Sequence, residues 1–154
     1  MKKLADWVVT ACLRGNGRVT LTKISKITNI PISTLYDKLR TNNGGIIKRH
    51  TCLLDYEKLG FNTRAHISLK IGKEDKLAAK DYLAKHQNIN SLLKINNGYD
   101  FLVDVVFRHM KELEDFLDDL KARFKVDECH VYYIIDEIKQ ESFLSNPEHV
   151  NLVM

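Results

Sequence analysis

The sequence lacks any long hydrophobic run. No apolar stretch approaches the roughly 18 residues that a membrane-spanning helix needs. The first segment, MKKLADWVVT, also lacks the uninterrupted apolar region of a secretory signal. With 154 residues, 44% hydrophobic and 29% charged, the composition is that of a globular protein of one ordinary domain or two small ones. We therefore expect a cytoplasmic protein with no membrane partner.

Cysteine is also scarce, and its three positions are far apart: Cys12, Cys52 and Cys129. No pair of Cys or His residues has the spacing of a zinc finger. Cys12 and Cys129 fall in apolar patterns, which favours small buried side chains. His130 follows Cys129, but neighbours on a strand point to opposite faces. The sequence therefore predicts no metal site, and it indicates no cofactor.

Acidic residues are few in the first part of the chain. Residues 1–60 hold 11 Lys and Arg against 4 Asp and Glu, a net charge of +7, whereas residues 61–154 hold 13 against 16, a net charge of −3. A basic segment suits a polyanionic partner, because neutralising phosphates releases counterions. The acidic remainder favours a sensing or assembly module. The alternative is that the split only tunes solubility.

The most informative pattern lies in residues 20–50, TLTKISKITNIPISTLYDKLRTNNGGIIKRH. Its apolar residues recur mostly at steps of three and four, which predicts two short helices with one buried face. They are Leu21, Ile24, Ile27, Ile30, Leu35 and Leu39. Thr20 or Thr22 is suited to cap the first helix, and Pro31 suits the turn or the start of the second. This arrangement is typical of a helix-turn-helix.

The other face of the second helix carries hydroxyl, aromatic and charged groups. They belong to Ser33, Thr34, Tyr36, Asp37, Lys38, Arg40 and Thr41. Such groups suit phosphate oxygens and base edges in a DNA major groove. The alternative is a small helical hairpin with a solvated face.

The flanking segments complete a DNA-binding domain over residues 1–54. A helix over 3–14 precedes the motif, with Leu4, Val8, Ala11 and Cys12 on its inner side, and Gly15 ends it. Gly44-Gly45 ends the third helix, and a basic strand runs from 46 to 54 with Lys48 and Arg49. Three helices and a basic strand predict a winged helix-turn-helix. A linker over 55–62 follows.

The pattern changes near residue 63, and residues 63–141 predict a second domain. Ala65, Ile67, Leu69 and Ile71 alternate with polar residues, as in a half-buried strand. A helix over 74–86, with Leu77, Ala78 and Tyr82 inward, precedes a strand over 89–95. The Asn96-Asn97-Gly98 hairpin leads to a strand over 100–107, a helix over 110–124 and a strand over 127–135. This order predicts an α+β, ferredoxin-like βαββαβ domain, followed by a C-terminal tail over 142–154.

Two strands of this domain are apolar on both sides. The runs are Leu102-Val103 with Val105-Val106, and residues 131–135. The helices of such a fold cover one face of the sheet, so the other face needs a second cover. We expect that cover to be the same sheet of another subunit, which gives a two-fold dimer. A dimer also presents two recognition helices to paired DNA half-sites.

Nearly the whole chain resembles the Lrp/AsnC family of prokaryotic transcriptional regulators. The resemblance rests on NGRVTLTKISKITNIPISTLYDKL, on IIKRHTCLLDYEKLGF, on the order of elements in the second domain and on the ending YYIIDEIKQESFL. It implies a winged helix-turn-helix that binds double-stranded DNA and a ferredoxin-like domain that forms dimers, tetramers or octamers. It also implies a small effector, usually an amino acid, bound between dimers.

The resemblance implies which residues of this chain contact DNA. Those implied to contact DNA are Thr22, Ser33, Thr34, Tyr36, Asp37, Lys38 and Arg40, with Lys48 and Arg49 as wing cations. Asp37 stands where the family often has arginine, and Asn42-Asn43-Gly44-Gly45 replaces a leucine and charged residues, so the recognition helix departs from the usual pattern.

The effector loop of the family aligns with Asn97, Gly98, Tyr99 and Asp100. Asp100 matches the family's aspartate and is suited to receive an α-amino group, while Gly98 could offer a backbone N–H to a carboxylate. Gly98 itself occupies the family's acidic position. The alternative is an Asn-Gly hairpin with a structural aspartate.

Two other functions stay open on the sequence. One is an architectural protein that coats DNA with little sequence preference. The other is an enzyme that resembles siroheme decarboxylases of similar two-part architecture, for which the candidate residues are Arg64, His66, Arg108, His109 and His130. No nucleophile and base pair or metal-ligand spacing supports them as a set, so the sequence predicts no catalytic residue.

Overall fold

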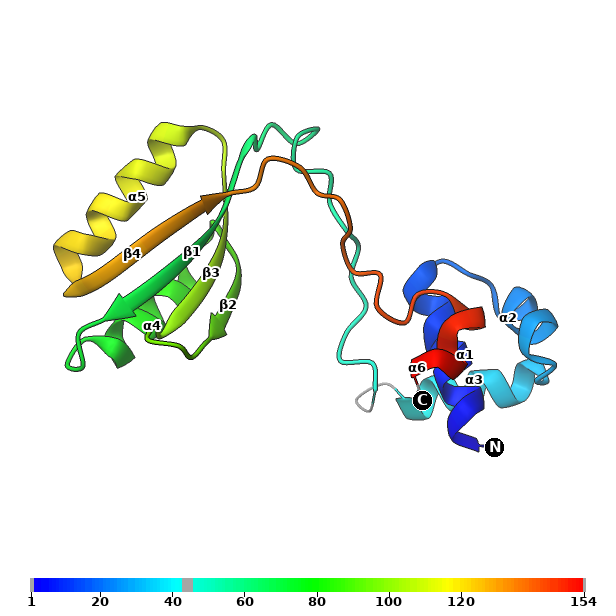
Figure 1. The fold of residues 1–154 in the computed structure, drawn as a ribbon. Helices are drawn as coiled ribbons and strands as arrows, with labels where there is room; N and C mark the ends of the chain where they lie inside the picture. The colour runs from blue at the N-terminus through cyan, green and yellow to red at the C-terminus, as the bar shows by residue number, and fades with distance from the viewer. Residues whose placement is uncertain (1, 43–45, 154) are drawn as a thin grey trace. The chain divides into compact units, whose positions relative to one another are not determined.

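The structure is a computed structural model that describes residues 2–42 and 46–153. The chain divides into two compact units (Figure 1). The first, which we call the helical unit, comprises Met1–Leu53 and Ile138–Met154, and the second, the sheet unit, comprises Leu54–Glu137. Within the described ranges, none of the helices is both long enough and apolar enough to pass through a bilayer.

The helical unit begins with three helices, α1 (Lys2–Gly15), α2 (Leu21–Thr28) and α3 (Ile32–Asn42). Thr20 caps α2, because its hydroxyl accepts a hydrogen bond from the N–H of Lys23 at 3.2 Å. Asn29 ends α2 in the left-handed conformation (φ 54°), and the carbonyl of Pro31 accepts the first helical hydrogen bond of α3. The predicted helix-turn-helix is confirmed.

The core of the helical unit joins all three helices. Its buried residues are Val9, Cys12, Ile24 and Leu35, with Leu13, Val19, Leu21, Ile30 and Leu39 packed against them. Three residues of the predicted core are not buried. Val9 is buried rather than Val8, with Leu4 exposed, and Ile27 is 49% exposed. Three short helices cannot cover every apolar position of a small unit.

The predicted basic strand over 46–54 is wrong. Among the described residues of that range, only Ile47 forms an isolated bridge, and residues 48–54 have no regular structure. An isolated strand has little stability without a sheet to pair with, and the other regular elements described in this unit are helices. The predicted helix break at Gly44-Gly45 lies outside the described residues.

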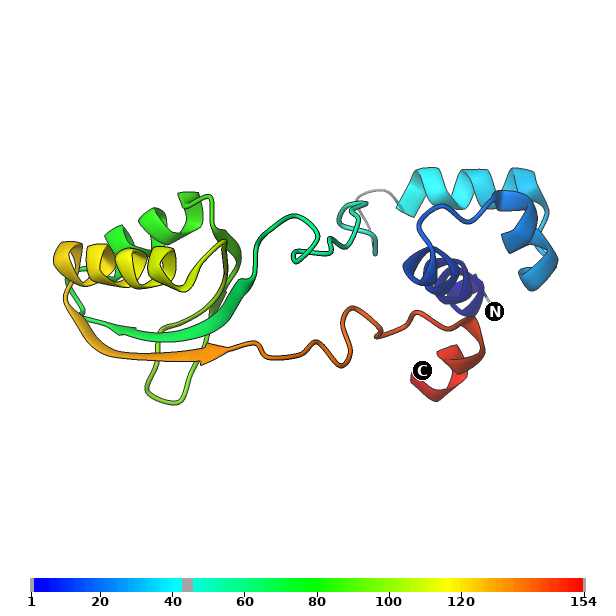
Figure 2. The same ribbon diagram turned by 90° about the horizontal axis from the view of Figure 1, so that it is seen from above.

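The C-terminal residues belong to the helical unit and contact α1. A short 3-10 turn, η1 (Pro147–His149), and α6 (Val150–Val153) pack against α1 (Figure 2), and Val150 is buried. Arg14 of α1 forms an ion pair with Glu141 and donates a hydrogen bond to the carbonyl of Phe143. A side chain at Gly15 would place its Cβ 2.5 Å from the carbonyl oxygen of Ser145, so the segment approaches α1 as closely as a glycine allows.

The sheet unit contains one four-stranded antiparallel sheet with the order β2-β3-β1-β4. Along the chain the elements are β1 (Thr63–Ile71), α4 (Lys76–Lys85), β2 (Ile89–Lys94), β3 (Phe101–Phe107), α5 (Met110–Arg123) and β4 (Val126–Tyr133). Both helices lie on the same side of the sheet (Figure 2). The predicted ferredoxin-like α+β fold is confirmed.

The core of the sheet unit lies between the sheet and the two helices. Its buried residues are Ala65, Ile67, Leu69, Ile71, Ala79, Leu83, Phe101, Val103, Val105, Phe107, Leu113, Phe116, Leu117 and Leu120. The predicted alternation on β1 is therefore confirmed. The predicted inner face of α4 is wrong in part, because Leu77 is 70% exposed and Ala78 is exposed, while Ala79 and Leu83 are buried.

The turn between β2 and β3 is the predicted Asn-Gly hairpin. Asn97 and Gly98 both have positive φ, 62° and 87°, as a type I′ turn requires. The N–H of Ile95 donates to the carbonyl of Asp100 at 3.0 Å and closes the turn.

Candidate functional site

The outer face of α3 holds most of the predicted DNA-contacting side chains. The exposed ones are Ser33, Thr34, Tyr36, Asp37 and Arg40. Thr22, at the start of α2, is exposed as well. Hydroxyl, phenol and guanidinium groups on one helix surface match the hydrogen-bonding groups of DNA.

Lys38 differs from its neighbours on α3. Its ammonium forms an ion pair with the carboxylate of Asp6 on α1, and the two side chains are only 21% and 27% exposed. Lys38 therefore fastens α3 to α1 instead of extending outward. Sequence reasoning missed this contact because the two residues are 32 positions apart and no local pattern links them.

Lys48 and Arg49 are exposed just after the bridge residue Ile47. The strand expected to carry them does not form, but both cations remain accessible. Sequence reasoning also omitted further exposed cations of the helical unit, namely Arg18, Lys23 and Lys26. The net positive charge of residues 1–60 was the feature of the sequence that indicated a role for these cations.

Asp100, in the predicted effector loop, already has two partners. Its carboxylate lies 2.6 Å from the ammonium of Lys76 and accepts a hydrogen bond from the N–H of Ile71 at 2.9 Å. Burial raises the pKa of the Asp100 carboxyl, but the bonds from Lys76 and Ile71 outweigh this and hold the pKa below its ordinary value. Asp100 thus joins the start of β3 to the end of β1 and the first residue of α4.

Tyr99 and Gly98 of the same loop have different surroundings. The hydroxyl of Tyr99 donates to Glu128 at 3.2 Å, and its ring meets the ring of His130 edge-on at 5.7 Å. Glu128 also accepts from Lys70 at 2.9 Å, and this ammonium lowers the pKa of the Glu128 carboxyl. A Cβ at Gly98 would meet nothing within 4 Å, so the loop is open at that residue. Asn97 is exposed beside it.

The face of the sheet away from α4 and α5, here called the open face, is partly apolar and partly polar. By the strand register it includes Arg64, His66, Ser68, Lys70, Ser91, Leu93, Leu102, Asp104, Val106, Glu128, His130 and Tyr132. Three buried polar atoms have no hydrogen-bond partner among the described residues: Arg64 Nε, Ser68 Oγ and Asp104 Oδ1. The closest group to Asp104 Oδ1 among the ion pairs is His66 Nε2 at 3.6 Å, which is too long for a hydrogen bond.

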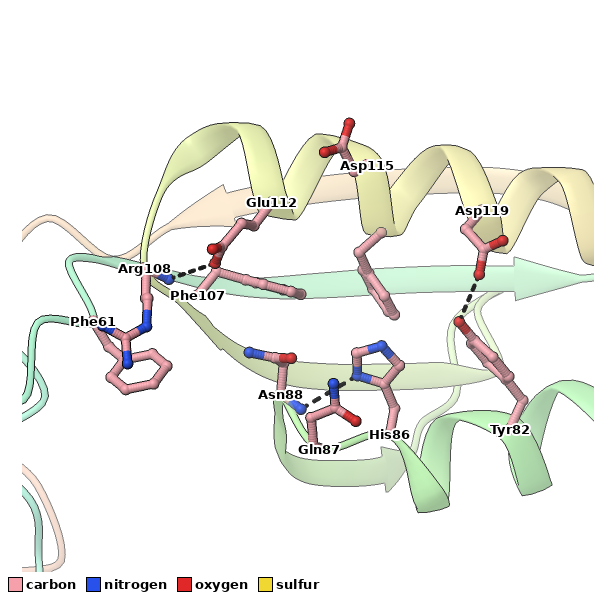
Figure 3. Close-up of a pocket in the computed structure, with 11 residues that line it drawn as sticks. Phe61, Tyr82, His86, Gln87, Asn88, Phe107, Arg108, Glu112, Asp115 and Asp119 are labelled. Carbon is pink, nitrogen blue, oxygen red and sulfur yellow. Dashed lines mark hydrogen bonds between the residues drawn. The ribbon is translucent and has the colours of Figure 1, made fainter.

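The residues considered for an enzymatic role lie in two groups. Arg64, His66 and His130 lie on the open face, whereas Arg108 and His109 precede α5. The guanidinium of Arg64 lies over the ring of Tyr56 at 4.6 Å, and that of Arg108 lies over Phe61 at 4.9 Å (Figure 3). Over residues 2–42 and 46–153, no three His, Cys, Asp or Glu side chains are grouped so that they could hold a metal ion.

Comparisons with known proteins agree with this architecture. The model of the Lrp/AsnC ligand binding domain matches residues 63–144. The chain is 30% identical over 142 residues to the HTH-type transcriptional regulator FL11 of Pyrococcus furiosus, which covers 90% of this chain and 93% of that protein. Among solved structures, LrpC of B. subtilis has a TM-score of 0.79 at 18% identity, over 88% of this chain and 96% of that one.

A second solved structure is the transcriptional regulator NMB0573 of Neisseria meningitidis in complex with L-Met. It has a TM-score of 0.77 at 24% identity, over 88% of this chain and 91% of that one. The family model matches more than half of the chain, and the similarity to FL11 covers 90% of it. The chain belongs to the Lrp/AsnC family of transcriptional regulators.

Proposed function

We propose that this regulator reads double-stranded DNA with the outer face of α3 and holds the phosphate backbone with Lys48 and Arg49. The observation that carries the proposal is the exposed set of hydroxyl, phenol and guanidinium groups on α3, directly after the turn of a helix-turn-helix. Lys38 is left out of this contact set because Asp6 holds its ammonium. With DNA as its target, the protein acts in the cytoplasm of a prokaryotic cell.

The open face supports the proposal of a dimer, or of a larger even assembly such as a tetramer or octamer. Leu93 and Tyr132 expose apolar surface there, at 55% and 57%. A second copy of the same face would cover this apolar surface, as in a two-fold dimer. It would also supply a second α3.

We further propose that an amino acid modulates the protein at the loop of Asn97, Gly98, Tyr99 and Asp100. The neighbour NMB0573 was solved with L-Met, which supports an amino acid as the ligand class. In this chain the α-amino group of the ligand has to compete with Lys76 for the Asp100 carboxylate. Effector binding therefore requires the Lys76 side chain to move.

Selection of bound fragments from genomic DNA, with and without a panel of amino acids, tests the proposal. We expect enrichment of a sequence with two similar half-sites, whose centres lie about one or more helical turns apart. Fragments without any shared sequence would instead support an architectural protein.

The enzymatic alternative has a separate test. Because Arg108 and His109 precede α5 and do not join Arg64, His66 and His130 on the open face, we expect no change in the absorbance spectrum of siroheme when the protein is added. A saturable spectral shift would support the enzyme.

A further inference from the structure

The first residue of α3 is an exposed isoleucine, Ile32, whose side chain is 47% exposed. Among the described residues, Leu35 and Leu39 of the same helix belong to the core of the helical unit or pack against it, and Ile32 does not. The apolar surface of Ile32 is therefore available to a partner.

Helix geometry places Ile32 beside the groups of α3 that are proposed to contact DNA. It directly precedes Ser33 and lies four residues before Tyr36, and all three side chains are exposed. Residues four apart are neighbours on a helix surface, so Ile32 and Tyr36 form one apolar and aromatic stripe. Leu35, which is fully buried, lies on the inner side of the helix.

The turn before α3 is held on both sides of Ile32. The carbonyl of Ile30 accepts a hydrogen bond from the hydroxyl of Ser25 at 2.6 Å, and the Ile30 side chain packs against the core. The carbonyl of Pro31 accepts a hydrogen bond from the N–H of Leu35 at 3.0 Å. These contacts fix the backbone that carries Ile32, and a selective contact requires such a fixed position.

The chemistry of the major groove leaves one group that suits an isoleucine. In a helix-turn-helix, the N-terminal residues of the second helix contact the base edges. Among the four bases, only thymine presents a methyl group in the major groove, on its C5 atom. The isoleucine side chain has no donor or acceptor, and a polar base edge pressed against it would lose its hydrogen bonds to water.

We propose that Ile32 selects an A·T pair in each half-site by packing against the C5 methyl group of the thymine. This inference rests on the proposed function, in which α3 contacts the bases, and adds an apolar contact to the polar groups of that helix. Since a dimer presents two copies of α3 to paired half-sites, one thymine methyl group is contacted in each half-site.

Replacement of single thymines by deoxyuridine, in the duplex obtained by genomic selection, tests the proposal. Uracil forms the same hydrogen bonds with adenine and differs from thymine only in lacking the C5 methyl group. We expect one position of a half-site at which the affinity of the parent protein, measured by fluorescence anisotropy, falls about fourfold, the factor for one methyl group removed from an apolar contact. Equal affinities for the thymine duplex and for every uracil duplex would overturn the proposal.

Two matched variants assign the methyl contact to a residue. Ile32→Ala removes the apolar side chain at the start of α3, whereas Ile27→Ala removes an isoleucine of α2 with nearly the same exposure, 49%. We expect Ile32→Ala to bind the thymine and uracil duplexes equally and Ile27→Ala to keep the difference seen with the parent. Loss of stability in either variant would weaken binding to both duplexes alike and leave the ratio of the two affinities unchanged.

The remaining outcomes separate this inference from the proposed function. If Ile32→Ala keeps the difference between thymine and uracil, or if Ile27→Ala loses it, the methyl group is not recognised by Ile32 and the inference is wrong. A parent protein that binds the selected duplex no better than a scrambled one would contradict the proposed function, and the inference with it.

Discussion

The ion pair between Lys38 and Asp6 joins α3 to α1 in the helical unit. Both side chains are mostly covered, so the pair has a structural role that its position on a recognition helix does not reveal. The orientation of α3, and with it the set of side chains that faces outward, depends partly on this contact.

Replacement of Lys38 and replacement of Arg40, two cations of α3, should therefore have different consequences. Lys38→Ala leaves the Asp6 carboxylate without its partner, and we expect it to lower the free energy of unfolding by about 1 kcal/mol. Arg40→Ala removes an exposed group, so it should leave stability within about 0.5 kcal/mol and weaken DNA binding instead. Urea denaturation and fluorescence anisotropy with labelled DNA measure the two effects. An unfolding midpoint that is the same for Lys38→Ala and the parent would contradict the structural role.

Lys48 should act on phosphates and not on bases. We expect Lys48→Ala to weaken binding to all DNA sequences alike and to reduce the slope of log K against log salt by about 0.9, the contribution of one phosphate contact. Equal salt slopes for the variant and the parent would contradict the phosphate contact.

The open face offers a direct test of the proposed dimer. Leu93 is 55% exposed in the single chain, so Leu93→Asp should leave the fold intact and make the protein monomeric by placing an unpaired charge in the interface. Leu77→Asp, on the helix side of the sheet, is the control, because Leu77 is also exposed. Light scattering after size-exclusion chromatography gives the mass of both variants. A mass for Leu93→Asp that equals that of the parent would exclude this face as the interface.

The C-terminal segment should contribute to the stability of the helical unit. An alanine at Gly15 would bring its Cβ within 2.5 Å of the Ser145 carbonyl oxygen, whereas an alanine at Gly17 would meet only the Leu13 carbonyl oxygen, at 3.9 Å. We expect Gly15→Ala to destabilise the protein by about 1–3 kcal/mol, as overpacking does, and Gly17→Ala to cost clearly less. Thermal unfolding of both variants measures this difference in stability. Equal melting temperatures would contradict the close packing of residues 141–150 against α1.

The contact of Asp100 with Lys76 should make stability depend on pH in a defined direction. The pKa of Asp100 is lowered in the folded chain, so its stabilising effect is full above the unfolded value of about 3.9 and is lost as the pH falls through the lower folded value. Asp100→Asn should therefore be less stable than the parent at pH 7, with a gap that narrows below about pH 4. Denaturation at several pH values measures the gap, and a constant gap would contradict the role of this carboxylate.

Local patterns in the sequence predicted most of the fold. The steps between Ile24, Leu35 and their apolar neighbours predicted the helix-turn-helix, and strict alternation from Ala65 to Ile71 predicted β1 and its buried face. The pair Asn97-Gly98 predicted the turn between β2 and β3, because few other pairs of residues adopt positive φ angles at two successive positions.

The errors have physical reasons. In α4, apolar residues occur at 77, 78, 79, 82 and 83, which surround most of the helix, so the sequence alone does not decide which side is buried. The contacts of Lys38 with Asp6, of Asp100 with Lys76 and of Gly15 with Ser145 join residues far apart in the chain. Only the folded structure brings such groups together. The sequence alone therefore could not show that Lys38 and Asp100 already have partners within the chain.

The most direct test of sequence-specific DNA binding is the affinity of the parent protein for DNA selected from the genome. Fluorescence anisotropy compares this affinity with that for a scrambled duplex over a range of salt concentrations. We expect the selected duplex to bind at least about 10³-fold more tightly than the scrambled one, with both affinities falling steeply as salt rises. Equal affinities for the two duplexes, or no binding at low salt, would contradict a sequence-specific regulator that reads DNA through α3.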